Sequence, residues 1–186
     1  MAVPTPETFS CETARLRLRP LMAGDEAFFC TLYADPETMR HIGPALSGAQ
    51  AADAFRSILG GMQRRPPGCA YLAMLDKTSL QPLGICGVPR LDASAIGLEV
   101  GLVLTAPARS RGIAREGLVA LVNSIFAATA VEEVWARLAK ENLAAQQVAA
   151  AIGFKACDEV LSGQELSSKR RWSVHRSSWH DAEPYQ

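Results

Sequence analysis

The alternation of apolar and polar residues along the chain gives the first view of its elements. Residues 15–19 read Arg-Leu-Arg-Leu-Arg, so the leucines face one side and the arginines the other, which predicts a half-buried strand. Apolar runs of strand length, bounded by turn residues, predict six more strands, at 69–75, 82–91, 96–104, 131–138, 154–161 and 169–179.

Helical spacing of apolar residues predicts four helices. Ser47 and Gln50 have the spacing of a capping box, which starts a helix that runs to about Gln63. Asp35-Pro36 ends an earlier helix and starts a short helical turn. Residues 180–186 are expected to form a frayed tail. The other three helices are expected at 25–34, 113–128 and 142–152.

The order of these elements predicts the class of the fold. Antiparallel strands in the middle of the chain, followed by strand–helix–strand, indicate an α/β fold with a mixed, mostly antiparallel sheet of about seven strands flanked by helices. No internal repeat or linker interrupts the 186 residues. We therefore predict a single domain over 1–186, with its core at about 12–179.

Composition and charge narrow the functional classes. Nineteen basic and nineteen acidic residues give a formal net charge of zero, which argues against a general nucleic-acid binder. The N-terminus lacks the pattern of a signal peptide, and no apolar run is long enough to span a membrane, so a cytoplasmic protein is expected. The cysteines have no CxxC spacing and predict neither a zinc site nor a disulfide framework; they are Cys11, Cys30, Cys69, Cys86 and Cys157.

The segment from Arg109 to Ala114 carries the clearest chemical signal. It follows a predicted strand and opens a predicted helix, so consecutive backbone N–H groups and the positive end of the helix dipole point at one place. Such a place suits a phosphate or pyrophosphate. The small residues Gly112 and Ala114 leave room for the anion, and neighbouring arginines add positive charge at the rim. An ordinary helix start with solvated arginines is the alternative.

Several segments together resemble the GNAT superfamily of N-acetyltransferases. Arg109-x-x-Gly112-x-Ala114 matches the superfamily's acyl-CoA motif, and Asn142 followed by Gly153-Phe154 resembles its second signature. Three further segments resemble the branch that acetylates ribosomal proteins at their N-termini, at 14–21, 35–43 and 99–104. The resemblance runs from about residue 12 to about residue 179, with the motifs in the family's order.

This resemblance implies a splayed sheet that binds acetyl-CoA where two parallel strands diverge. Backbone amides from Arg111 to Arg115 would hold the pyrophosphate, and the strand 96–104 would line the pantetheine arm. A primary amine would attack the acetyl thioester directly, with strand N–H groups polarising the carbonyl. The residues implied in cofactor binding are Leu102, Val103, Leu104, Arg109, Arg111, Gly112, Ile113, Ala114, Arg115 and Asn142.

Two residues are the expected catalytic groups. An ammonium cannot attack a thioester, so a base must take its proton, and Glu99 is the candidate because the resembled branch carries Glu at this position. Asn142 would hydrogen-bond near the thioester. The alternative for Glu99 is a simple ion pair with an arginine such as Arg90.

Two positions depart from the family pattern. The superfamily often has Tyr seven residues after the Asn, as the acid for the leaving thiolate, and the ribosomal-protein branch often has Ser three residues after it. The chain has Ala149 and Ala145 there. Either the thiolate leaves unassisted, or the donor is elsewhere; the candidates are Tyr33, His41 and Tyr71.

The expected activity is transfer of an acetyl group to a primary amine, either a protein N-terminus or a small molecule. Because both usual acid positions are alanine, a non-catalytic protein that binds or senses acyl-CoA is the alternative. An exposed edge strand near the C-terminus makes a homodimer possible.

Overall fold

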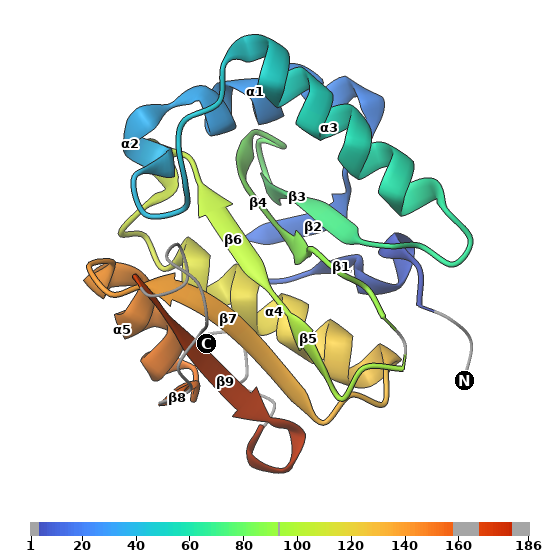
Figure 1. The fold of residues 1–186 in the computed structure, drawn as a ribbon, viewed down its shortest axis with the longest axis vertical. Helices are drawn as coiled ribbons and strands as arrows, with labels where there is room; N and C mark the ends of the chain where they lie inside the picture. Colours follow the sequence, from blue (N-terminus) through green and yellow to red (C-terminus); the bar gives the residue numbers. More distant parts are fainter. Residues whose placement is uncertain (1–3, 93, 158–167, 180–186) are drawn as a thin grey trace.

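The computed structural model describes residues 4–92, 94–157 and 168–179 and forms two sheets with helices on both faces (Figure 1). The first sheet has the order β1-β2-β3-β4-β6 and is antiparallel throughout. Its strands are β1 (Cys11–Glu12), β2 (Leu16–Pro20), β3 (Ala70–Asp76), β4 (Pro82–Val88) and β6 (Gly101–Leu104).

The second sheet has the order β5-β7-β9-β8 and contains a parallel pair. β5 runs parallel to β7, whereas β9 is antiparallel to both β7 and β8. Its strands are β5 (Gly97–Glu99), β7 (Glu133–Ala139), β8 (Lys155–Cys157) and β9 (Lys169–His175). The mixed, mostly antiparallel sheet flanked by helices is therefore confirmed.

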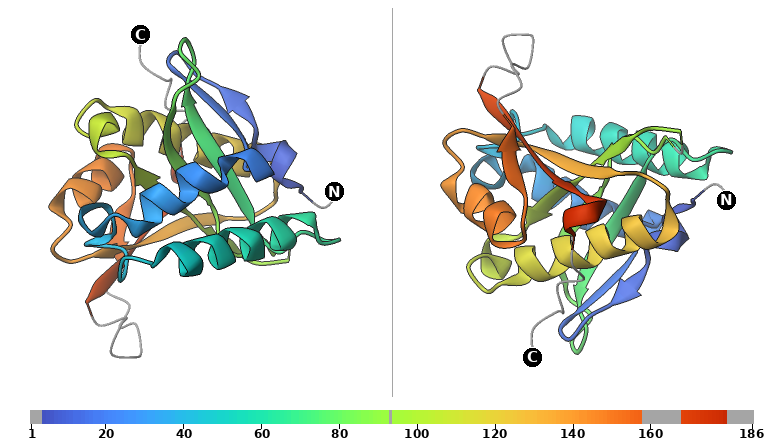
Figure 2. Two further views of the ribbon diagram at one scale, coloured as in Figure 1. Left: turned by 90° about the horizontal axis from the view of Figure 1, so that it is seen from above. Right: turned by 90° about the horizontal axis from the view of Figure 1, so that it is seen from below.

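The helices form two layers. The α-helices are α1 (Glu26–Ala34), α2 (Pro36–Met39), α3 (Gly48–Gln63), α4 (Ile113–Ala128) and α5 (Leu143–Ala151). Short 3-10 turns are η1 (Pro6–Phe9), η2 (Ala23–Asp25), η3 (Ala106–Ala108) and η4 (Arg176–Ser178). Figure 2 shows α1 and α3 across one face and α4 across the other.

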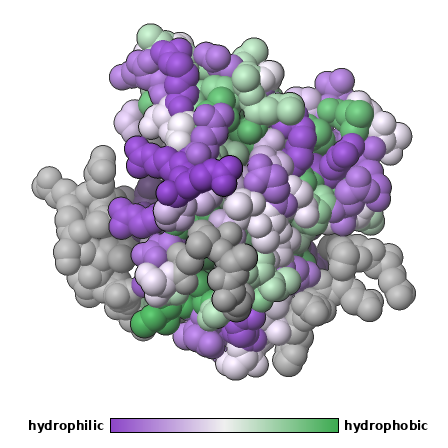
Figure 3. All heavy atoms as spheres, turned by 90° about the vertical axis from the view of Figure 1, so that its right-hand side faces the viewer, coloured by the Kyte–Doolittle hydropathy of each residue, from purple (hydrophilic) through white to green (hydrophobic). Residues whose placement is uncertain are grey.

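Each helical layer encloses its own core. The larger core includes Leu16, Leu72 and Met74 from the first sheet and Leu121 and Ile125 from α4, all fully buried. The second core lies under α1 and α3. Exposed large apolar residues are spread over separate segments, at Met22, Ile42, Leu80, Ile96 and Leu143. The face in Figure 3 accordingly mixes hydrophilic and scattered hydrophobic side chains.

Local sequence explains several element boundaries. The capping box is present at the start of α3: the Gln50 N–H donates to the Ser47 hydroxyl and the Ser47 N–H donates to the Gln50 amide oxygen. The prediction of about seven strands was too low, because the described residues form nine. The predicted strand 96–104 is two strands, and β1 was not expected.

Other predicted strands were too long. β4 ends at Val88 rather than at 91, and β9 ends at His175, where η4 begins. The predicted strand 154–161 is β8 as far as Cys157, and residues 158–161 lie outside the described residues. The tail 180–186, expected to be frayed, also lies outside them.

Candidate functional site

The chain changes sheet at Val100, and this change creates an opening. Glu99 pairs with Trp135 of β7, and the Val100 N–H still donates to the Trp135 carbonyl at 2.8 Å. One residue later, Gly101 pairs with Gly87 of β4 in the other sheet. β6 therefore leaves β7 after the switch: β6 ends on the side of α2, whereas β7 ends beside α5 (Figure 1). The parallel pair diverges here, as the family resemblance implied.

The backbone of β6 faces the opening at alternate residues. The Thr105 N–H donates to the Leu83 carbonyl at 2.9 Å, so Thr105 and, two residues earlier, Val103 turn their backbone polar groups toward β4. Leu102 and Leu104 consequently turn theirs toward the opening. Val103 also buries its side chain in the core under α1 and α3. The polar groups and the side chain of Val103 thus both have partners inside the protein, and its expected contact with the cofactor stays a prediction.

The loop before α4 has the backbone geometry of an anion cradle. Ser110 and Gly112 both have positive φ, at 57° and 77°. Ile113, Ala114 and Arg115 open α4, so their N–H groups have no carbonyl one turn earlier in the helix to bond. A Cβ at Gly112 would come within 3.2 Å of the Arg15 guanidinium, which leaves glycine as the residue that fits. These features fit a diphosphate, which backbone amides and the positive end of the helix dipole both favour.

The three arginines of this region differ in their surroundings. Arg109 does not point its guanidinium freely at the rim: Nη2 donates to the Thr38 hydroxyl at 2.6 Å and to the Leu104 carbonyl at 3.3 Å. The Thr38 hydroxyl in turn donates to Asp35. The side chain of Arg109 thus ties the loop to α2, and its expected part in cofactor binding stays a prediction. Arg111 is exposed and Arg115 is half-buried.

A buried ionic cluster, not foreseen from the sequence, holds the same loop from below. Glu116 in the first turn of α4 accepts hydrogen bonds from the Thr13 hydroxyl at 2.5 Å, the Arg15 N–H at 2.9 Å and Arg15 Nε at 2.7 Å. Burial alone would raise the pKa of Glu116, but the bonds from Thr13 and Arg15 outweigh it and lower that pKa. A carboxylate within the apolar stripe of a helix is the sequence signal that could have indicated a buried hydrogen-bonding partner such as Arg15.

Glu99 lies at the switch point and is paired. Arg137 Nε donates to one carboxylate oxygen at 2.8 Å and Arg137 Nη2 to the other at 2.7 Å. The alternative prediction, that Glu99 pairs with an arginine, is confirmed, but the arginine is Arg137 and not Arg90. Arg90 lies beyond the end of β4, whereas Arg137 is on β7, the strand beside Glu99. The Arg137 guanidinium also lies 5.4 Å from the centre of the Trp135 ring, and that of Arg171 lies 4.7 Å from it.

Asn142 starts α5. Its side-chain oxygen accepts from the Ala145 N–H at 3.1 Å, which makes Asn142 the N-cap and leaves its amide NH₂ as the group with which to reach a ligand. Ala149, at the usual acid position, is buried in the larger core. The side chain at this position faces the core, so Ala149, where the superfamily often has Tyr, contributes to core packing.

The candidate proton donors differ in their environments. Burial, together with the charges of Cys69 and Glu99, raises the pKa of Tyr71 to about 12. Burial and the neighbouring Tyr71 raise the pKa of Tyr33 further, and Tyr33 stacks on Phe29 with ring centres 4.2 Å apart. Tyr71 is therefore the candidate in electrostatic contact with Glu99. His41 is half-buried in the turn after α2.

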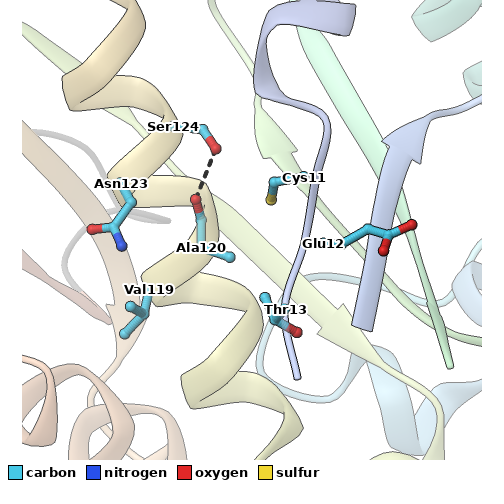
Figure 4. Close-up of a pocket in the computed structure, with 7 residues that line it drawn as sticks. All are labelled: Cys11, Glu12, Thr13, Val119, Ala120, Asn123 and Ser124. Carbon is cyan, nitrogen blue, oxygen red and sulfur yellow. Dashed lines mark hydrogen bonds between the residues drawn. The ribbon is translucent and has the colours of Figure 1, made fainter. Parts of the chain in front are cut away.

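A separate cleft lies between β1 and the middle of α4 (Figure 4). It has a volume of about 140 Å³ and is lined by Cys11, Glu12, Thr13, Val119, Ala120, Asn123 and Ser124. Burial raises the pKa of Cys11, and a hydrogen bond with Ser124 opposes the increase.

All five cysteines are free, and Cys69 and Cys86 are buried. The described residues contain neither a cluster of three metal-ligating side chains nor a helix able to cross a membrane.

Comparison with known proteins identifies the family. Residues 15–155 match the family profile of the acetyltransferase (GNAT) domain. A comparison with curated proteins found no significant match.

Solved structures share the fold. An acetyltransferase from Agrobacterium tumefaciens is 20% identical, with a TM-score of 0.76 over 95% of this chain and 96% of its own. Spermidine N-acetyltransferase from Vibrio cholerae, in complex with CoA and spermine, is 16% identical, with a TM-score of 0.73 over 89% and 98%. Ribosomal-protein-S5-alanine acetyltransferase from Vibrio fischeri is 16% identical, with a TM-score of 0.71 over 92% and 98%. With three quarters of its length matching the family profile, the chain belongs to the GNAT family of acetyltransferases.

Proposed function

We propose that the protein is an acetyl-CoA-dependent N-acetyltransferase that modifies a primary amine by direct attack. The observation that carries the proposal is the opening between β6 and β7 next to the positive-φ loop at the start of α4. An acetyl thioester on a diphosphate-containing carrier needs both features, an unpaired strand backbone for its arm and a ring of amides for its phosphates.

In this proposal, the carrier is held mainly by backbone groups. The N–H groups from Arg111 to Arg115, including those of Gly112, Ile113 and Ala114, face the diphosphate. The backbone of Leu102 and the N–H of Leu104, whose carbonyl already accepts from Arg109, bond the pantetheine arm as an added strand would. The amide NH₂ of Asn142 lies at the thioester end of that arm. Arg109 acts through the loop that it fixes.

Glu99 acts as the general base. Acetyl-CoA supplies an acetyl thioester, to which the amine adds as the C–S bond breaks and the thiolate leaves. Arg137 occupies one site on each carboxylate oxygen of Glu99, but each oxygen keeps a second site that can accept a proton from the amine or from a water. The bidentate pair also fixes the carboxylate at the point where the sheet splits, which orients it for this role.

Tyr71 serves as a hydrogen-bond donor to the leaving sulfur. With a pKa of about 12, its hydroxyl stays protonated at neutral pH. A thiol has a pKa of about 8.5, so complete proton transfer from Tyr71 to the thiolate is unfavourable by roughly 3.5 pKa units. The thiolate therefore leaves as an anion, stabilised by a hydrogen bond, and needs no stronger acid at Ala145 or Ala149.

The acceptor is a primary amine, either a protein N-terminus or a small molecule, and the reaction takes place in the cytoplasm. The structural neighbours named above include a spermidine acetyltransferase and a ribosomal-protein acetyltransferase, so the family leaves the acceptor class open.

Calorimetric titration with acetyl-CoA tests the cofactor assignment, with the Ala114→Glu variant in parallel. This variant places a carboxylate beside the proposed diphosphate site, so we expect binding to the parent protein and its loss in the variant. Absence of binding to the parent would refute the proposal. A panel of amine acceptors then tests transfer: binding without acetylation of any amine would favour the non-catalytic alternative.

A further inference from the structure

Arg15 connects three segments that meet at the start of α4: its own segment before β2, the first turn of α4, and the loop at Arg111. It lies just before β2, and its guanidinium donates to Glu116 in α4 through Nε at 2.7 Å, with Nη2 2.6 Å from the same carboxylate oxygen. Nη1 donates to the carbonyl of Arg111 at 2.9 Å. The Glu116 side chain is 1% exposed, so this carboxylate fixes the guanidinium firmly in place.

The bond to the Arg111 carbonyl has a geometric consequence. A trans peptide is planar, and its C=O and N–H point in opposite directions. The Arg111 carbonyl and the Gly112 N–H belong to the same peptide. Because Arg15 holds the carbonyl on the side of β2, the Gly112 N–H must point away from β2, in the direction of the loop's outer surface.

The loop needs such a support. Ser110 and Gly112 both lie in the left-handed region of backbone space, where a peptide can rotate at little cost to its neighbours when one of them is glycine. Without a fixed carbonyl, the amides of this loop would sample several directions. A bound anion would then have to order the loop, which weakens binding.

We propose that Arg15 is a positioning residue, which directs the Gly112 N–H toward the diphosphate of the acetyl carrier through its hydrogen bond to the Arg111 carbonyl. The inference rests on the proposed function and adds a residue outside the acyl-CoA motif to the cofactor site. It also explains the cluster with Thr13 and Glu116: the cluster fixes Arg15, and Arg15 in turn neutralises a carboxylate that would otherwise repel the phosphates.

Titration with CoA compares the parent protein with Arg15→Gln and with Arg17→Gln as the matched control. Arg17 is two residues away, within β2, and makes only an exposed ion pair with Glu12 at 3.7 Å. We expect the dissociation constant to rise about ten-fold or more in Arg15→Gln and to stay unchanged in Arg17→Gln. If the parent binds CoA and Arg15→Gln binds it equally well, the inference is wrong. If the parent does not bind CoA, it is the proposed function that fails.

Two further variants separate positioning from charge. Arg15→Lys keeps the positive charge, but one ammonium group replaces the fork that reaches both Glu116 and the Arg111 carbonyl, so we expect it to bind nearly as weakly as Arg15→Gln. It also replaces Arg15→Gln if that variant does not fold. The double variant Arg15→Gln/Glu116→Gln leaves no unpaired carboxylate, and we expect it to bind CoA as weakly as Arg15→Gln. If either variant bound CoA with the affinity of the parent protein, Arg15 would act only through its positive charge, which neutralises Glu116, and the inference would be wrong.

A spectroscopic measurement reads the Gly112 amide directly. In ¹⁵N–¹H spectra, saturating CoA should move the Gly112 amide proton downfield in the parent and in Arg17→Gln, because the amide gains a charged acceptor. In Arg15→Gln at saturation this shift should be reduced, whereas a loss of stability alone would leave it unchanged. An identical Gly112 shift in Arg15→Gln would refute the positioning role.

Discussion

Substitution of Gly112 by alanine tests the link between backbone geometry and cofactor binding. Gly112 has a φ of 77°, and a residue with a side chain pays about 1–2 kcal/mol in this left-handed region. The added Cβ would also lie 3.2 Å from the Arg15 guanidinium, which must move by a few tenths of an ångström. For a chain of this length, we therefore expect the melting temperature to fall by about 2–8 °C.

The same change should weaken cofactor binding by more than the stability loss implies. Rotating the peptide out of the left-handed region relieves the strain, but it turns the Gly112 N–H away from the diphosphate. Loss of one amide bond to a charged group costs about 1.5–3 kcal/mol, which corresponds to roughly ten-fold or greater loss of affinity for acetyl-CoA. Calorimetric titration below the melting transition measures this directly.

Gly153 provides the matched control. Its φ is 93°, and nothing lies within 4 Å of an added Cβ, so Gly153→Ala carries the backbone strain without a clash. We expect it to melt at a lower temperature and to bind acetyl-CoA normally. Equal affinity in Gly112→Ala and the parent would refute the reasoning that this loop is the diphosphate cradle, and an unchanged melting temperature would refute the strain argument.

Three other outcomes follow from the site. Glu99→Gln should lower kcat by about 10²–10⁴ while the dissociation constant of acetyl-CoA stays the same, and equal turnover in steady-state assays would remove Glu99 from the mechanism. Asn142→Ala should lose about 1 kcal/mol of stability with the N-cap, whereas Asn142→Asp should restore the melting temperature but not the affinity for acetyl-CoA; full affinity in Asn142→Asp would exclude a role for the amide NH₂. Because the pKa of Glu116 is lowered on folding, its stabilising contribution is complete above the unfolded carboxyl pKa of about 4.3 and is lost as pH falls through the folded value. Glu116→Gln should therefore melt at a lower temperature at pH 7 and lose less stability than the parent in melts below about pH 5; parallel curves would contradict this.

The elements were predictable because their signals are local. The capping box at Ser47 and the apolar stripe of α4 are both read within one or two helical turns, and both helices begin and end where expected. The switch at Val100 has no such signal: apart from Glu99, residues 96–104 carry no polar side chain, and the stretch is divided only because β5 pairs in one sheet and β6 in the other.

The contacts of the site depend on residues far apart in the chain. The loop and its glycine were visible in the motif, but Arg15 is 101 residues from Glu116, and Glu99 is 38 residues from Arg137. A sequence shows that each of these side chains is charged and does not show which pairs meet. In the same way, the alternation at 15–19 predicted a half-buried strand but gave no sign that Arg19 makes a bidentate pair with Asp25.

The contact between Arg109 and Thr38 has a consequence for protein engineering. It joins two residues that are 71 positions apart, Thr38 in α2 and Arg109 in the loop before α4. A chimera that takes α1 and α2 from a relative with an apolar residue at 38 would leave the half-buried guanidinium of Arg109 without its hydroxyl partner. The loss of stability would be comparable to that of leaving a buried hydrogen-bond donor unsatisfied. Exchanges intended to change acceptor preference should therefore transfer the residues at 38 and 109 together.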